Sequence, residues 1–288
     1  MTQPKGFEDA TNPNHLCRLN KAIYGLRQAP RQWYTTLTTY LLSIGFSHSK
    51  SDQSLLIFKE NSVTIYLLVY VDDILVTGDN STAIQRLLDQ LNRQFSMKHL
   101  GEANMFLGIR ITKQNDQYFL SQEQYASSIL QQADMLNCNS LANPTVTKFP
   151  SVFSPNTVIS DPAMYRKLTG ALQYLTLTRP DIAFSVNLLS QHMHDPKPEH
   201  TYLLKRLLRY IKGTLSFGLQ ITRNNLILQS FSDADWAGDP ISRKSTSGYC
   251  SFLGTNLISW TVKKQHTVAR SSTESEYRSL ASLTADII

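Results

Sequence analysis

The chain has 288 residues, 41% of them hydrophobic, and its 28 lysines and arginines exceed its 22 acidic residues to give a formal net charge of +6. This length and apolar content allow about two domains with their own cores, which argues against a disordered chain. The basic excess favours a polyanionic partner, although many soluble proteins have a similar excess. Three cysteines, Cys17, Cys138 and Cys250, are odd in number, far apart and without zinc-site spacing, which favours a reducing intracellular compartment.

In the first 120 residues, helical and strand patterns alternate. Helices are predicted at 32–45 and 82–95, and strands at 54–58 and 63–76. The alternation is typical of an α+β fold built on an antiparallel sheet. The apolar run at 63–76 is interrupted by two aspartates and falls short of the ~20 residues that a membrane span needs, and no signal peptide precedes it. We therefore expect a soluble chain with no membrane partner.

The remainder of the chain first reads as helical and then as strands. A helix is predicted at 121–135, followed by a loop or linker at 139–161 that is rich in Pro, Asn, Ser and Thr. Helices resume between 162 and 213. The last elements are three short strands and a helix, at 226–231, 248–253, 257–262 and 272–288.

Two adjacent carboxylates, Asp72 and Asp73, separate two apolar strands and are expected at a hairpin tip. Such carboxylates repel each other and are costly to desolvate unless a divalent cation neutralises them, as in two-metal phosphoryl or nucleotidyl transfer. The same pattern is also typical of a solvated hairpin turn, since Asp is an ordinary turn residue. The surrounding motifs have to decide between these interpretations.

An ordered series of motifs surrounds the aspartate pair. KAIYGLRQAPRQWY begins at residue 21, FSMKHLGE at 95 and MFLGIRI at 105. The series continues with YRKLTGALQY from 165, TRPDI from 178, SDADWAG from 232 and SSTESEY from 271. In this order the motifs resemble the reverse transcriptase of copia-type LTR retrotransposon Pol polyproteins, over nearly the whole chain.

The resemblance implies a three-part α+β organisation and a function. Residues 1–120 would form a partial reverse-transcriptase palm, an antiparallel sheet with helices. Residues 121–223 would form helical thumb or connection structure with the loop at 139–161, and 224–288 an incomplete ribonuclease H-like α/β module. The family function is RNA-directed DNA synthesis with ribonuclease H activity. Its partners are an RNA template, a DNA primer or hybrid and deoxynucleoside triphosphates, and association with a full-length Pol polyprotein is also expected.

The resemblance assigns the polymerase chemistry to the first part. Asp72 and Asp73 would be ligands of two Mg²⁺ ions, whose preferred ligands are oxygens. A nucleotide- and template-contact loop would precede them, whereas the residue pattern alone also fits a helix N-terminus with an early proline. The predicted loop residues are Tyr24, Gly25, Arg27, Gln28 and Pro30.

Two further assignments in this part depend on the resemblance. Lys98 would stabilise charge or donate a proton near the leaving pyrophosphate, although a solvated lysine is an equally ordinary interpretation. Phe106, Leu107 and Gly108 would form the turn that grips the primer, and the alternative is a plain hairpin glycine.

The helical part carries a basic stripe. Lys205, Arg209 and Lys212 fall on one side of a predicted helix whose other side is apolar. The stripe is predicted to bind nucleic acid because of the thumb resemblance, and its alternative is a solvated helix face. His192 and His194 are two residues apart, so they are interpreted as surface residues and not as metal ligands.

The last part carries two carboxylates at positions where ribonuclease H enzymes bind metal. Asp233 would end a strand and Glu276 would lie early in a helix, both as Mg²⁺ ligands, with Asp235 and Glu274 as near matches. The alternatives are a turn at 235–238 and a helix capping box formed by Thr273 with Glu276.

Both two-metal sites are expected to be incomplete. The family has another catalytic aspartate upstream of residues 3–7 and a third ribonuclease H carboxylate downstream of this sequence. The chain alone is therefore expected to have little or no activity. The alternative is a non-enzymatic nucleic-acid-binding or interfering protein derived from a retroelement, and a relic without a selected role is a third interpretation. For the family, the location would be a cytoplasmic particle or the nucleus.

Overall fold

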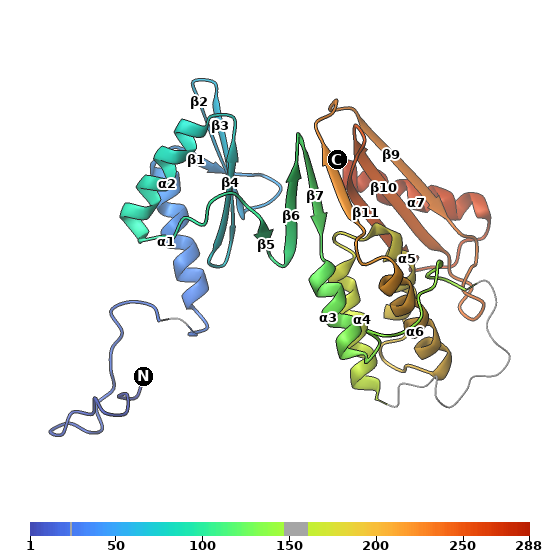
Figure 1. Cartoon of the computed structure of the whole chain (residues 1–288), viewed down its shortest axis with the longest axis horizontal. Coiled ribbons are helices and arrows are strands. Elements are labelled where there is room, and N and C mark those ends of the chain that lie inside the picture. Colours follow the sequence, from blue (N-terminus) through green and yellow to red (C-terminus); the bar gives the residue numbers. More distant parts are fainter. Residues whose placement is uncertain (24, 147–160) are drawn as a thin grey trace. The chain divides into compact units, whose positions relative to one another are not determined.

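The computed structural model describes residues 1–23, 25–146 and 161–288 (Figure 1). The chain forms two compact units, Met1–Ala103 and Asn104–Ile288. The strand pairings within their sheets are antiparallel, and helices accompany them, which confirms the predicted α+β class. None of the helices in the described ranges combines the length and apolar character needed to cross a bilayer.

The first unit is a four-stranded sheet with two helices. Its strands follow one another in space as in the sequence. Leu37, Leu41, Leu56, Leu67 and Leu91 are buried at the centre of its core. The elements are α1 (Ala29–Ser43), β1 (Phe46–His48), β2 (Leu55–Glu60), β3 (Val63–Tyr70), β4 (Asp73–Gly78) and α2 (Ser81–Phe95).

The second unit begins with a sheet that the sequence patterns did not predict. The sheet has the order β5-β6-β7-β8, and β8 comes from about a hundred residues further along the chain. Its strands are short and carry mostly half-buried or exposed side chains, so their apolar alternation is weak. The elements are β5 (Met105–Phe106), β6 (Ile109–Gln114), β7 (Gln117–Ser121) and β8 (Gly218–Thr222).

Helices occupy the chain between β7 and β8. They share one core, to which Tyr165, Leu172, Leu204 and Leu208 contribute fully buried side chains. Each predicted helical segment is confirmed as helical. The elements are α3 (Glu123–Gln132), α4 (Pro162–Leu175), the 3₁₀ turn η2 (Pro180–Ile182), α5 (Ala183–Ser190) and α6 (Pro198–Gly213).

Three strands and a helix complete the second unit, as predicted. The strand order is β11-β10-β9, and α7 packs on β9 and β10. The Ser279 hydroxyl of α7 bonds to the carbonyls of Asp233 and Gly248, at 2.9 and 3.2 Å. The elements are β9 (Leu228–Ala234), β10 (Thr246–Leu253), β11 (Asn256–Lys264) and α7 (Ser272–Ile287).

The boundary between the compact units lies before the β5–β6 hairpin. Because β7 pairs with β8 along five residues of each strand, this hairpin sheet belongs with the helices of the second unit. The division into parts at 1–120, 121–223 and 224–288 is based on the family resemblance and differs from the two compact units, and it stays a prediction.

A buried arginine ties the helices to the start of β8. Arg179 is 1% exposed. Its Nε and one terminal nitrogen form a two-point ion pair with Asp181, at 2.9 and 2.7 Å. The guanidinium also donates to the carbonyl and hydroxyl of Thr214, at 2.8 and 2.7 Å. Burial alone would raise the pKa of Asp181, but the Arg179 guanidinium and the Tyr210 hydroxyl hold it below its ordinary value.

His192 is not the simple surface residue that the sequence predicted. Its ring stacks on that of His200, with centroids 3.6 Å apart, because the chain turns between α5 and α6 and the two histidines do not share a helix. The backbone N–H of Lys197 donates to His200 Nδ1 at 3.0 Å, which favours the neutral ring. Burial, followed by the neighbouring His192, lowers the pKa of His200 to about 4.

Replacing Arg179 by Met should destabilise the second unit strongly. The change leaves Asp181 as a partly buried carboxylate without its cation and removes two bonds to Thr214. We expect the free energy of unfolding in urea to fall by about 3 kcal/mol. Arg278→Met is the control, because it breaks a more solvent-accessible pair with Glu274 in α7 and two bonds to Thr267, and it should cost about 1 kcal/mol. Equal losses in the two variants would contradict the assigned role of Arg179.

Stability should fall on acidification through the His200 ring. An unfolded histidine binds a proton near pH 6.5, whereas folded His200 does so only near pH 4. The unfolded state therefore binds more protons between these values, and stability declines as the pH falls from about 6.5 to about 4. Urea unfolding over this range should show a smaller decline in His200→Gln, whereas His194→Gln, at an exposed ring outside the stack, should keep it. An unchanged pH dependence in His200→Gln would refute the assignment.

Candidate functional site

The Asp72–Asp73 pair lies at the tip of the β3–β4 hairpin, as predicted. Tyr70 pairs with Asp73, so Val71 and Asp72 form the two-residue turn. Val71 has a φ of 53°, a left-handed conformation that is rare for a β-branched residue and costs on the order of 1–3 kcal/mol. The indole nitrogen of Trp33, in α1, donates to the Val71 carbonyl at 2.7 Å. Helix α1 thus holds this strained turn in place.

The two aspartates present free carboxylates. Both side chains are exposed, and within the described ranges no hydrogen bond or ion pair engages either of them. Exposed carboxylate oxygens suit a hard divalent cation such as Mg²⁺. The described residues contain no group of three or more His, Cys, Asp and Glu side chains placed to hold a metal. The donor chemistry therefore fits, with two carboxylates supplied by the hairpin.

The predicted nucleotide-contact loop leads into α1. Gly25 has a φ of 92°, Gln28 is the N-cap residue, and Pro30 stands in the first turn, so the alternative of a helix N-terminus is what the backbone forms. No side chain caps this end and its first turn holds no acid. Pro30 has no N–H and that of Ala29 donates to the Leu26 carbonyl, so the Arg31 N–H and the exposed Arg27 make the helix start compatible with an anion. Tyr24 lies outside the described residues.

The contact loop and the aspartate pair belong to the same unit. Trp33 lies one turn into α1, so its bond to Val71 brings the beginning of the helix beside the hairpin tip. The Trp33 ring also packs edge-on against Phe95, at 5.5 Å between centroids. In the sequence, Trp33 stands out only as part of a motif, because a bond between residues 38 positions apart leaves no local signal.

Lys98 is exposed in the irregular segment that follows α2. Ser96 ends the helix in a left-handed conformation, and Met97 packs against the core of the first unit. No bond within the described ranges fixes the lysine side chain. The role of Lys98 therefore stays a prediction.

The predicted primer-grip residues form a hairpin turn in the second unit. Phe106 ends β5, and Leu107 and Gly108 have φ values of 49° and 74°, as in a type I′ turn. The Tyr174 hydroxyl of α4 donates to the Leu107 carbonyl. Tyr174 thus anchors a turn 67 positions away in the sequence. The glycine meets the requirement of a plain hairpin as well, so primer contact stays a prediction.

The basic stripe on α6 is partly engaged. The Nε of Arg209 donates to the Asn139 carbonyl at 2.7 Å, and that of Arg206 to the Thr145 carbonyl at 2.8 Å. The described end of the predicted loop, 139–146, is therefore fastened to this helix. Lys205 and Lys212 are half-buried. A nucleic-acid-binding role for Lys205, Arg209 and Lys212 stays a prediction.

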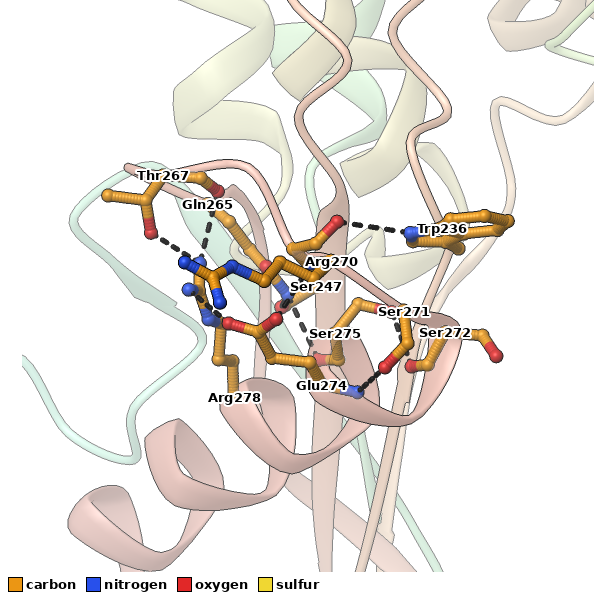
Figure 2. Close-up of polar contacts among 11 residues, drawn as sticks. Trp236, Ser247, Gln265, Thr267, Arg270, Ser271, Ser272, Glu274, Ser275 and Arg278 are labelled. Carbon is orange, nitrogen blue, oxygen red and sulfur yellow. Dashed lines mark hydrogen bonds and ion pairs between the residues drawn. The ribbon is translucent and has the colours of Figure 1, made fainter.

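The start of α7 corrects the predicted capping box. The Ser271 hydroxyl accepts the backbone N–H of Glu274 at 3.1 Å, and Glu274 accepts the N–H of Arg270 and pairs with Arg278 (Figure 2). The Arg270 N–H, and then Arg278, lower the pKa of Glu274. The cap thus uses Ser271 and Glu274 and not Thr273 and Glu276, because the helix begins two residues earlier than that alternative requires.

The remaining acids in this region separate into engaged and free side chains. Asp235 accepts the N–H of Thr246 at 2.5 Å and fills the space beside Gly238, which leaves no room for a side chain there. The exposed carboxylates of Asp233 and Glu276 form no hydrogen bond or ion pair in the described part of the chain. They lie on β9 and α7, which pack together. The two predicted metal ligands thus have free carboxylates, whereas the carboxylates of the two near matches, Asp235 and Glu274, are bound to neighbouring groups.

Comparisons with known proteins agree with the order of the motifs. Residues 1–147 match the family described as "Reverse transcriptase (RNA-dependent DNA polymerase)". Over 288 residues the chain is 46% identical to the "Retrovirus-related Pol polyprotein from transposon RE2" of Arabidopsis thaliana, and 46% identical to that from transposon RE1. All of this chain and 20% of each polyprotein are aligned, so the chain spans about a fifth of the length of these relatives.

A shorter relative is also similar. The chain is 50% identical over 224 residues to "Uncharacterized mitochondrial protein AtMg00810" of Arabidopsis thaliana, which aligns 77% of this chain with 93% of that protein. These matches confirm the resemblance to copia-type Pol polyproteins. The chain therefore belongs to the reverse transcriptase (RNA-dependent DNA polymerase) family, as a segment similar to part of a retrotransposon Pol polyprotein.

Proposed function

We propose that the Asp72–Asp73 hairpin is the metal-binding part of an RNA-directed DNA polymerase site. The observation that carries this proposal is a pair of free carboxylates on a strained turn that Trp33 holds by its carbonyl. The favoured two-residue hairpin turns require a positive φ at their first residue, which Gly or Asn adopts without strain, so a plain solvated turn needs neither a β-branched valine there nor the indole bond. Strain kept in place by a neighbouring helix is typical of functional sites.

Residues of the first unit would carry out the chemistry at this site, and the predicted primer-grip turn belongs to the second unit. Asp72 and Asp73 would hold Mg²⁺, which, when bound, activates the primer hydroxyl and neutralises charge on the incoming triphosphate. Arg27 and the N–H of Arg31 in the first turn of α1 would bind and orient phosphate. Lys98 would stabilise the leaving pyrophosphate. Phe106, Leu107 and Gly108 would position the primer through a turn that Tyr174 anchors.

A second site, for hydrolysis, would use Asp233 and Glu276. Both carboxylates are exposed, on a strand and a helix that pack together, while Asp235 and Glu274 are engaged in the local structure. Oxygen ligands in this arrangement suit Mg²⁺ and hydrolysis of the RNA strand of a hybrid. The pair would be the first half of a ribonuclease H metal site.

The partners of the longer polyprotein would be an RNA template, a DNA primer and deoxynucleoside triphosphates. Each candidate site has two carboxylates in the described residues, and two-metal catalysis uses more. We therefore expect the chain alone to have little or no activity in either reaction. The alternative function is nucleic-acid binding without turnover, in competition with a full-length Pol polyprotein, and the net charge of +6 favours it.

The hairpin tip should bind a divalent cation. Substoichiometric Mn²⁺ should broaden the amide NMR signals around Asp72 and Asp73, and excess Mg²⁺ should reverse the effect. Asp72→Asn/Asp73→Asn should abolish the broadening, because amides are poor ligands for hard cations. The comparison is the Asn115–Asp116 turn of the β6–β7 hairpin, which has a single exposed carboxylate. Broadening at the tip no stronger than at that turn would support the solvated-turn interpretation.

Primer extension by the chain itself should be absent or nearly so. The assay uses an RNA template, a DNA primer, deoxynucleotides and Mg²⁺, with the chain compared with Asp72→Asn/Asp73→Asn. We expect no difference in incorporation, because two carboxylates do not complete a two-metal site. Incorporation that disappears in the double variant would mean that another carboxylate completes the site. Template binding that persists without incorporation in both proteins would favour the binding function.

A further inference from the structure

One face of the β5–β8 sheet gathers cationic and aromatic side chains. The antiparallel register sets Lys113 opposite Tyr118 and Tyr118 opposite Ile221, so the three form one row across β6, β7 and β8. Tyr118 is 42% exposed and Ile221 is 39% exposed. The ammonium of Lys113 lies 5.9 Å from the centroid of the Tyr118 ring. The row thus combines an accessible ring, an aliphatic surface and a charge.

This row lines an open hollow of about 390 Å³. Arg223, directly after β8, adds a second cation to the hollow, and Asp116 in the β6–β7 turn adds one carboxylate. Among the residues that the structure describes, neither Lys113 nor Arg223 forms an ion pair. The hollow therefore has a positive balance with both cations available to a ligand.

The opposite face of the same sheet carries neutral amides beside the β6–β7 turn. Gln114 lies opposite Gln117 on that face, and the Gln220 amide donates to Gln117. Phe119 and the exposed Arg110 follow further along the same face, away from the turn. A sheet face that meets only water gains nothing from a half-exposed tyrosine and isoleucine between two cations that form no ion pair among the described residues. The row of Lys113, Tyr118 and Ile221, with Arg223 beside it, indicates a ligand with negative charge and flat, partly apolar surfaces.

We propose that this face, defined by Lys113, Tyr118, Ile221 and Arg223, binds single-stranded nucleic acid. Phosphates would lie at Lys113 and Arg223, and a base would stack on Tyr118 beside Ile221. The lysine–tyrosine contact is weak at an exposed site, so an incoming base and phosphate can replace it. Asp116 repels phosphate and so restricts the backbone to the other side of the hollow.

The inference deepens the proposed function and rests on it. It adds a surface for a strand in the second unit, whereas Asp72 and Asp73 belong to the first. The net charge of +6 supplies the long-range attraction for a polyanion. Because the aromatic ring offers a stacking surface to any base, the binding should depend little on sequence.

The test is fluorescence anisotropy with a labelled 12-nucleotide oligouridine at several salt concentrations. Lys113→Gln/Arg223→Gln should weaken binding about tenfold at low salt. It should also lower the slope of log affinity against log salt by about 1.4, since each single-strand phosphate contact contributes about 0.7. Lys59→Gln/Lys263→Gln is the control, because it removes the same charge at two exposed sites elsewhere and should keep the slope.

Tyr118→Leu separates stacking from charge. It should weaken binding about fivefold or more while leaving the salt slope unchanged, because it removes the ring and keeps an apolar side chain. An RNA–DNA duplex and poly-glutamate should compete poorly with the labelled strand. Unchanged thermal melting of the variants would show that they remain folded.

Several outcomes would overturn the inference. These are no binding by the parent chain, equal effects of the two double variants, or a duplex or poly-glutamate that competes as well as the single strand. Mn²⁺ binding at the Asp72–Asp73 hairpin is measured without nucleic acid. If the parent chain does not bind the strand at this face but the metal effect is present, this inference alone is overturned. If the metal effect is missing, the polymerase proposal is overturned.

Discussion

The second unit depends on the bonds that the Arg179 guanidinium makes with Thr214. Thr214 is the residue at which α6 ends, four residues before β8 begins. By donating to both its carbonyl and its hydroxyl, Arg179 fixes where the helix ends. Strand β8 starts close to that fixed point and pairs with β7 along five residues, which joins the helices to the hairpin sheet. A buried charge of this kind is tolerable only because Asp181 neutralises it and every donor that points inward has an acceptor.

The β3–β4 hairpin of the first unit differs from this paired arrangement, because its charged groups are left without partners among the described residues. Its backbone is strained at Val71 and its carboxylates have no partners among the described residues, so the turn is not the lowest-energy solution for the hairpin alone. The sheet and the Trp33 indole hold it nonetheless. Such a turn is maintained by packing from behind while its acidic side remains open, which is the arrangement that cation binding requires.

Many elements of the fold can be predicted from local sequence patterns, whereas the long-range contacts that join them cannot. The β3–β4 hairpin and the β9–β11 strands were predicted from apolar, β-branched or aromatic runs, and the helices from their helical patterns. Strands β6, β7 and β8 were not predicted, since they are short and half-exposed and β8 pairs with a strand about a hundred residues earlier in the sequence. The aspartate pair was visible in the sequence, but Trp33 and Tyr174 were not visible as anchors. Their bonds span 38 and 67 positions, and only the tertiary fold brings those atoms together.

Acidic side chains supply the clearest link between the fold and the proposed chemistry. Asp181, Asp235, Asp239 and Glu274 are each engaged by an arginine, a lysine or backbone N–H groups. A chain with more cations than anions could engage its other acids in the same way. Glu276 lies two residues from Glu274, which attracts both Arg270 and Arg278, yet it has no such partner in the described residues. Within the β9–α7 region, Asp235, Asp239, Glu274 and Asp286 are engaged, so Asp233 and Glu276 are the acids without a partner among the described residues, and they are the two that the motif order assigns to metal.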